Sequence, residues 1–390
     1  MNWRISQRPR CAVHSVLRWI KIGVLGGSMM AGPVFAADDP RPIMHEVVDA
    51  LAFLLPLSFD DDRFTDPDQA SMTKQKLKLL EESADKLEAH AGDRDVGFRM
   101  LSGSLAQAVR RMRRYYDYSR PEDARFFLID LTQNCVACHS RLPGGQGYPL
   151  AAQLMKRVDV PTLHTRDRAQ LQVALRQFED ALTSWEELFA LPHIDPVELD
   201  VEGDLIDYLT ISIRVLNNPE RARGTLKKLK ERDDLPTYMQ MHIEGWIEGL
   251  DRLGSEVSQA PTLERARQLF TKASGLSVLP AGRERAVYDL AASGVLHRYI
   301  DAKGDQQGEE VAEAYYMLAI IETRTVEPKA AVPQMEFHLE AAIRSNPKGE
   351  WAKRAYAVLE EYSLVNYAGL MLDESPEELD RLETLKELMD

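Results

Sequence analysis

The chain has 390 residues, of which 44% are hydrophobic and 28% are charged, and its formal net charge is −14. This balance excludes a disordered or collagen-like chain, and three cysteines are too few for a fold held together by disulfides. The negative charge also disfavours sequence-independent binding of nucleic acid, because the phosphates would repel the protein.

Residues 1–36 have the composition of a secretory signal peptide. The first 21 residues carry five basic side chains and no acidic one, and the apolar run that follows ends in Val34-Phe35-Ala36, a small-x-small cleavage pattern. The alternative is an uncleaved anchor, but about 15 apolar residues interrupted by glycines and Pro33 fall short of the roughly 20 that a membrane helix needs. We expect cleavage near Ala36, a soluble periplasmic protein without a membrane span, and a mature net charge of −19, from 43 Lys and Arg against 62 Asp and Glu.

Residues 40–142 are predicted to form a four-helix bundle. Apolar residues recur at intervals of three and four in segments that we expect to be helical, Pro42–Leu57, Ser71–His90, Arg94–Tyr118 and a fourth that begins at Ser119. The fourth segment opens with a proline and two acidic residues, which are favoured in the first turn of a helix. Four amphipathic helices within about 100 residues indicate an antiparallel bundle.

The rest of the chain is predicted to be helical after a linker. The glycine- and proline-rich run 142–149 fits neither a helix nor a central strand, so residues 143–165 are interpreted as a linker between domains. From 166 to 390 the spacing of apolar residues is helical throughout. Two short sequences also occur twice in this region: Glu-Arg-Ala-Arg at 220–223 and 264–267, and Ala-Tyr at 314–315 and 355–356. We therefore expect an all-α chain whose residues 166–390 form a solenoid-like helical-repeat domain, with a compact helical domain as the alternative.

The sequence Cys-Val-Ala-Cys-His at 135–139 is the attachment signature for c-type haem. On a helix, Cys135, Cys138 and His139 fall within an arc of about 100°, so two thiols and an imidazole face the same side. The thiols would form thioethers with the haem vinyls and His139 would bind the iron. A dithiol redox site is a less favoured alternative, because such sites lie within a βαβ pattern that is not predicted here. A structural zinc site is also less favoured, because it would need further ligands and the only other cysteine, Cys11, lies in the predicted signal peptide.

Residues 41–141 resemble the cytochrome c prime family and its low-spin relatives, in which haem is attached near the end of the last helix of a four-helix bundle. The resemblance rests on Cys135, Cys138 and His139 and on the number and order of the helices. It implies that the first helix lines the sixth position of the iron with an apolar side chain or a methionine. Met44 is therefore the candidate distal ligand, with Met155, His45 and an open position as alternatives.

The C-terminal region resembles a degenerate tetratricopeptide-type array, most of all over Ala330–Glu360. We therefore expect an exported monohaem c-type cytochrome that transfers single electrons and recruits redox partners or assembly components through its repeats. We do not expect an enzyme. The alternatives are a five-coordinate haem sensor or scavenger of nitric oxide or carbon monoxide, and an assembly scaffold with a structural haem.

Two further sets of residues are interpreted without a specific function. The arginines at 110, 111, 113 and 114 are expected to form the solvated face of the third helix, with haem propionates or an acidic partner as the alternative ligands. Several histidines, among them His242, His297 and His338, are scattered singly and are expected to be surface or core residues.

Overall fold

The computed structural model of the chain describes residues 40–58, 61–91, 96–118, 120–125, 127–128, 131, 163–192, 199, 201–254, 260–276, 283–303, 306–325, 328–370 and 376–390. Within these ranges the regular secondary structure is helical and contains no strand, as predicted. The predicted signal peptide, the haem motif and all but the last three residues of the predicted linker lie outside them. Residues Pro40–Asp390 belong to one compact unit.

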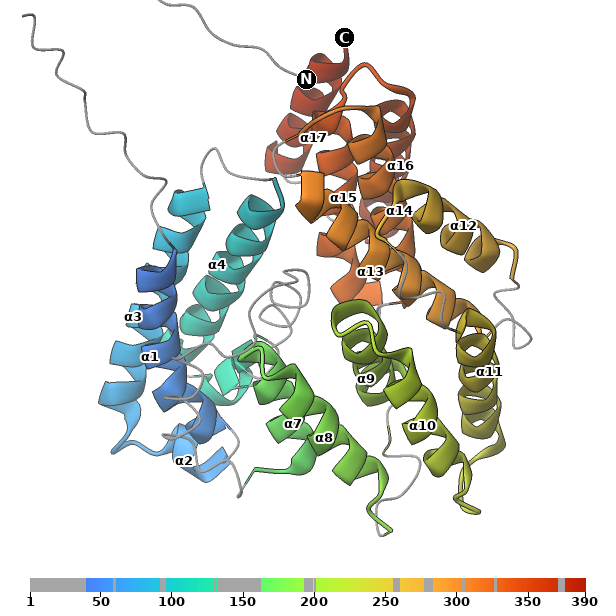
Figure 1. The fold of residues 1–390 in the computed structure, drawn as a ribbon. Helices are drawn as coiled ribbons and strands as arrows, with labels where there is room; N and C mark the ends of the chain where they lie inside the picture. Colours follow the sequence, from blue (N-terminus) through green and yellow to red (C-terminus); the bar gives the residue numbers. More distant parts are fainter. Residues whose placement is uncertain are drawn as a thin grey trace, which may run out of the picture. The chain divides into compact units, whose positions relative to one another are not determined.

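Three of the four predicted bundle helices are present with nearly the predicted bounds. They are α1 (Arg41–Ser58), α3 (Ala70–Ala91) and α4 (Val96–Asp117), and α3 packs against both of the others (Figure 1). Residues 121–125, 127–128 and 131 are helical as well, in the position of the predicted fourth helix.

One apolar core joins these helices. Leu54 of α1, Leu80 of α3 and Met112 of α4 are fully buried in it. Ala124, Leu128 and Leu131 of the fourth helical segment belong to the same cluster. Burial of such side chains from four segments contributes roughly 1.5–3 kcal/mol for each large aliphatic residue, which is enough to order helices that would be marginal alone.

A short helix, α2 (Asp61–Thr65), was not predicted from the sequence. Its five residues are too few to show a period, but Phe64 is fully buried and meets the ring of Tyr116 edge to face, with ring centroids 5.8 Å apart. The packing of Phe64 therefore stabilises a short helix that the local sequence would not form by itself.

The C-terminal helices follow one another as packed pairs. Their bounds are α7 (Thr165–Ala174), α8 (Phe178–Phe189), η3 (Val201–Leu205, π-helical), α9 (Ile206–Leu209), η4 (Thr210–Val215, π-helical), α10 (Pro219–Lys230), α11 (Thr237–Leu253), α12 (Leu263–Ser274), α13 (Arg285–Lys303), α14 (Glu309–Thr325), α15 (Pro328–Ser345), α16 (Glu350–Leu370) and α17 (Pro376–Met389). Successive helices are in contact from α10 to α11 and from α12 to α17 (Figure 1).

The internal similarity noted in the sequence falls at equivalent places in these helices. Both copies of Glu-Arg-Ala-Arg open a helix, one behind the cap Asn218 and the other behind the cap Thr262. Each cap accepts a hydrogen bond from the backbone N–H three residues later, at 3.2 Å. Ala314 and Ala355, from the second pair of similar segments, are both fully buried. The repeated residues are thus helix starts and core contacts.

The helices of the described residues do not include one that is both long enough and apolar enough to cross a bilayer.

Candidate functional site

The predicted haem-binding residues are only partly within the described chain. Cys135, Cys138, His139 and Met155 lie outside it, whereas Met44 and His45 lie inside it. Of the predicted haem ligands and their alternatives, the structure therefore describes only Met44 and His45.

The segment that leads into the motif is anchored in the bundle core. Ala124, Leu128 and Leu131 are buried at spacings of four and three residues. The ring of Phe127 stacks on Tyr115 of α4, with centroids 5.0 Å apart and planes at 17°. The Arg125 guanidinium donates to the carbonyl of Ser58 at the end of α1, at 2.8 Å. These contacts fix the helix four residues before Cys135.

Met44 lies in the first turn of α1 and packs against the bundle core while remaining half-buried. The next residue, His45, is exposed, so the two alternative ligands on α1 differ in their surroundings. Glu46 fixes this end of α1 to α3, because it accepts hydrogen bonds from Lys86 at 2.6 Å and from Ser83 at 3.0 Å. The bond from Lys86, more than any other contact, lowers the pKa of Glu46 below its usual value. A thioether at position 44 is thus held beside apolar side chains at a defined helix end.

Two of the four arginines, Arg110 and Arg113, are bound to acidic residues of α3, whereas Arg111 and Arg114 are exposed. Arg110 contacts Asp85 at 2.7 Å and Glu88 at 2.5 Å, and Arg113 pairs with Glu81. Hydrogen bonding to Glu88 raises the pKa of Arg110. These ion pairs connect α3 to α4, so Arg110 and Arg113 have a more specific role than the solvated face that the sequence predicts, while Arg111 and Arg114 lie on such a face.

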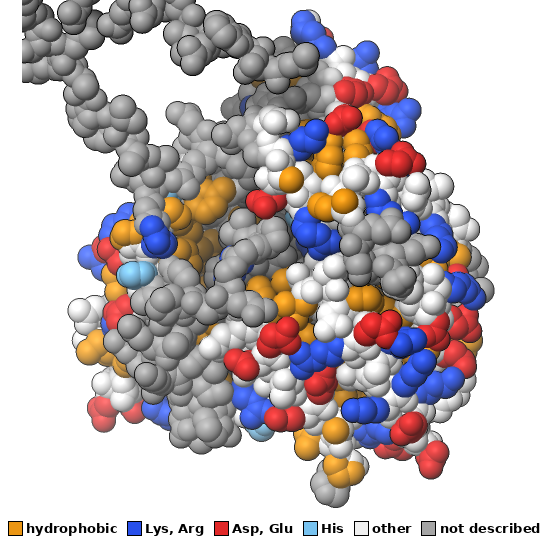
Figure 2. Space-filling model, in the orientation of Figure 1, with side chains coloured by type: hydrophobic (Ala, Val, Ile, Leu, Met, Phe, Trp, Pro, Cys, Tyr) orange, Lys and Arg blue, Asp and Glu red, His pale blue; other side chains and the backbone are white. Residues whose placement is uncertain are grey.

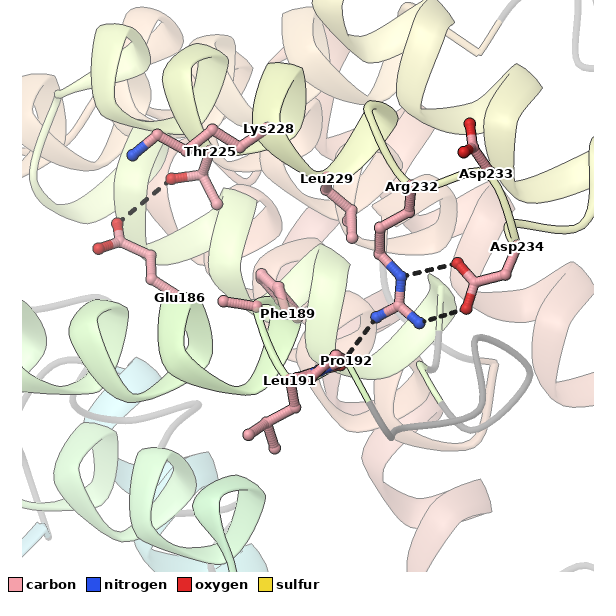
Figure 3. Close-up of a pocket in the computed structure, with 11 residues that line it drawn as sticks. Glu186, Phe189, Leu191, Pro192, Thr225, Lys228, Leu229, Arg232, Asp233 and Asp234 are labelled. Atoms are coloured by element: carbon pink, nitrogen blue, oxygen red, sulfur yellow. Dashed lines mark hydrogen bonds and ion pairs between the residues drawn. The ribbon is translucent and has the colours of Figure 1, made fainter.

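A pocket of about 550 Å³ lies on α8, α10 and the turns that follow them (Figure 3). Phe189 and Leu229 contribute apolar side chains, and Lys228, Asp233 and Asp234 add charges of both signs. Arg232 is engaged within the pocket, where it donates to Asp234 at 2.9 and 2.8 Å and to the carbonyl of Leu191 at 3.2 Å (Figure 3). The lining therefore combines apolar and charged side chains.

Glu186 forms one wall of this pocket. Burial alone would raise its pKa, but hydrogen bonds from Arg221 at 2.7 Å and Tyr208 at 2.8 Å bring the pKa below its usual value. Burial in turn raises the pKa of Tyr208. Glu186 is therefore an ionised, fixed acceptor at the edge of the pocket.

The surface in Figure 2 carries acidic and basic side chains close to one another, and where side chains are coloured no large patch of a single sign forms on that face.

A buried polar cluster joins η4, α13, α14 and α15. Arg214 donates to Glu322 at 2.8 Å, and the same nitrogen is 3.1 Å from Nε2 of His297. Nε2 of His338 is 3.9 Å from Oε1 of Glu322. The Arg214 and Glu322 side chains are only 4% and 0% exposed, so this ion pair is removed from water.

This cluster could not be recognised in the sequence, where His297 and His338 stand 41 residues apart as single histidines. Their helices are α13 and α15, and packing against α14 brings both toward Glu322. One local signal was present: Glu322 follows Leu318, Ala319 and Ile321 on the buried face of α14. An acidic residue on such a face requires a partner.

A second buried carboxylate, Asp289 of α13, lies between two arginines. Oδ2 of Asp289 is 3.4 Å from Arg285, and Oδ1 is 3.5 Å from Arg324. Burial raises the pKa of Asp289 to about 6, although both arginines act to lower it. Asp289 therefore exchanges its proton near neutral pH while it is folded.

Comparison with models of protein families, with curated proteins and with solved structures gives no match.

Proposed function

We propose that this chain is an exported c-type cytochrome with one covalent haem, which transfers single electrons and engages partner proteins through its C-terminal helices. The observation that carries the proposal is the sequence Cys-Val-Ala-Cys-His at 135–139, which unites two thiols and an imidazole at the haem-attachment spacing. The haem would supply an iron that alternates between the ferric and ferrous states. Its location would be the periplasm, where attachment through Cys135 and Cys138 prevents loss of the cofactor.

The helical segment that leads toward the motif supports this proposal. The buried positions Ala124, Leu128 and Leu131 alternate spacings of four and three. The same alternation in the sequence reaches Cys135 and Cys138, so on a helix that continued through the motif the two thiols would extend this buried stripe. Apolar surroundings of that kind would suit a porphyrin.

Met44 is the proposed sixth ligand. Its half-buried side chain contacts the bundle core from the first turn of α1, whereas His45 is exposed. In an up-down-up-down bundle the start of the first helix lies beside the end of the fourth. Methionine ligation raises the reduction potential and suits electron transfer.

The paired helices from α7 to α17 support the proposed docking role. Their repeated caps and buried alanines agree with a degenerate tetratricopeptide-like array, and arrays of this kind present extended surfaces to partners. The pocket on α8 and α10 adds a recess with apolar and charged sides for a partner's side chain. The proposed partners are redox proteins or assembly components.

The test is an absorption spectrum of the chain expressed in a host that attaches c-type haem. A low-spin ferric spectrum with the long-wavelength band of methionine–iron ligation is expected, and Met44→Ala should abolish that band while Met155→Ala retains it. A high-spin spectrum with rapid binding of carbon monoxide would instead indicate the five-coordinate sensor or scavenger. Absence of haem from the exported wild-type chain would refute the proposal.

A further inference from the structure

Three metal-binding side chains converge between α13, α14 and α15. His297, Glu322 and His338 each offer one ligand atom, and these three atoms lie within 4.8 Å of one another. Among the described residues this is the one group of three or more such side chains with that spacing. It involves none of the residues assigned to the haem.

The cluster is buried, which separates it from the acidic groups that commonly meet on protein surfaces. Glu322 is 0% exposed and His338 is 1% exposed, while His297 is half-buried. One carboxylate oxygen of Glu322, Oε1, accepts the hydrogen bond from Arg214. The other, Oε2, has no hydrogen-bond partner among the described residues although it is buried. A buried carboxylate oxygen without a hydrogen-bond partner would be stabilised by a bound cation.

Arg214 lies where it could hold the carboxylate ligand of such a site by a hydrogen bond without contacting the metal itself. Its backbone lies against Gly294 of α13, where a Cβ atom would come within 2.9 Å of the Arg214 carbonyl oxygen. Gly294 lies three residues before His297, so this close approach sets the guanidinium beside the imidazole. Metal-bound carboxylates are commonly held by a hydrogen bond to their second oxygen, and the bond from Arg214 to Oε1 would provide it.

We propose that His297, Glu322 and His338 bind a divalent transition metal, with zinc as the ion that fits best. Two imidazoles and one carboxylate form a known zinc ligand set, which leaves the fourth position to water. Tetrahedral zinc with bonds of about 2.0–2.2 Å would hold the ligand atoms roughly 3.3 Å apart. The ligand atoms now lie within 4.8 Å of one another, and Arg214 Nη2 is 3.1 Å from Nε2 of His297. Binding therefore requires side-chain rotations that draw the three atoms together and move the guanidinium away from the imidazole, so that Arg214 contacts Glu322 alone.

The test is zinc binding by the full exported chain after treatment with a chelator. Calorimetry should show one zinc ion per chain, and zinc X-ray absorption should show nitrogen and oxygen neighbours at about 2.0–2.1 Å with the outer scattering of imidazole. Both readouts are independent of haem, so failure here leaves the proposed cytochrome function untouched.

The variants His297→Gln and His338→Gln should bind zinc at least tenfold more weakly than the wild type. The matched control is His242→Gln, because His242 is also a half-buried histidine but contacts Trp246 of its own helix. Its affinity should be unchanged. His297→Gln removes a side chain that is only half-buried, and unchanged far-UV circular dichroism should show that it folds. Absence of zinc binding by the wild type would overturn the proposal, as would equal affinity in the wild type and His297→Gln.

Discussion

Removal of one charge from the Arg214–Glu322 pair should strongly destabilise the C-terminal helices. The side chains are 4% and 0% exposed and lie 2.8 Å apart, so Glu322→Leu would leave a guanidinium without its counter-charge in a dry environment. Breaking a buried pair in this way costs about 3–5 kcal/mol. We expect that loss in the free energy of unfolding, measured by guanidinium titration with far-UV circular dichroism in the presence of a chelator.

The double variant Arg214→Met/Glu322→Leu provides the control. Because it removes both charges and retains apolar volume, its stability should return to within about 1–2 kcal/mol of the wild type. The two single changes would then show a coupling energy of at least about 2 kcal/mol. A cost below about 1 kcal/mol for Glu322→Leu, or a double variant equal to the sum of the singles, would refute the reasoning.

Three other changes test separate parts of the fold. Burial raises the pKa of Asp289 to about 6, so this carboxyl keeps its proton to a higher pH in the folded than in the unfolded chain. Relative to Asp289→Asn, the free energy of unfolding of the wild type should therefore fall by about 2–3 kcal/mol between pH 4 and a pH above 6. An equal pH dependence of stability in the two proteins would contradict this prediction. Leu80→Ala should lower the free energy of unfolding by about 2–5 kcal/mol, because Leu80 is fully buried. Lys78→Ala, at an exposed position of the same helix, should change it by less than about 0.5 kcal/mol. Equal losses in the two variants would contradict the placement of Leu80 in the bundle core. Asn218→Ala, which removes the cap of α10, should cost about 1 kcal/mol by the same method, and no loss would contradict its capping role.

Helix positions in the bundle were predictable because α3 and α4 have one apolar stripe each. Leu77, Leu80 and Leu87 recur at helical spacing in the second predicted segment, and all three are buried. The first segment was less informative. Residues 51–57 are apolar around the whole helix, so periodicity could not show that Val47 and Leu54 are fully buried while Val48 is only half-buried.

The buried cluster in the C-terminal helices shows what sequence reasoning lacks. Arg214 and His338 are separated by more than a hundred residues, and their proximity results from the packing of η4 on α13 and of α14 on α15. No local spacing encodes such a meeting. The haem motif is the opposite case, since Cys135, Cys138 and His139 lie within five consecutive residues and their chemistry can be inferred from spacing alone.

Covalent attachment of haem to Cys135 and Cys138 is tested most directly by the mass of one tryptic peptide from the exported protein. Cleavage after Arg125 and Arg141 releases residues 126–141, which contain both cysteines and His139. We expect this peptide to carry the added mass of one haem and to absorb visible light after the protein has been unfolded. A peptide of unmodified mass, from a host whose haem-attachment system modifies other cytochromes, would contradict it.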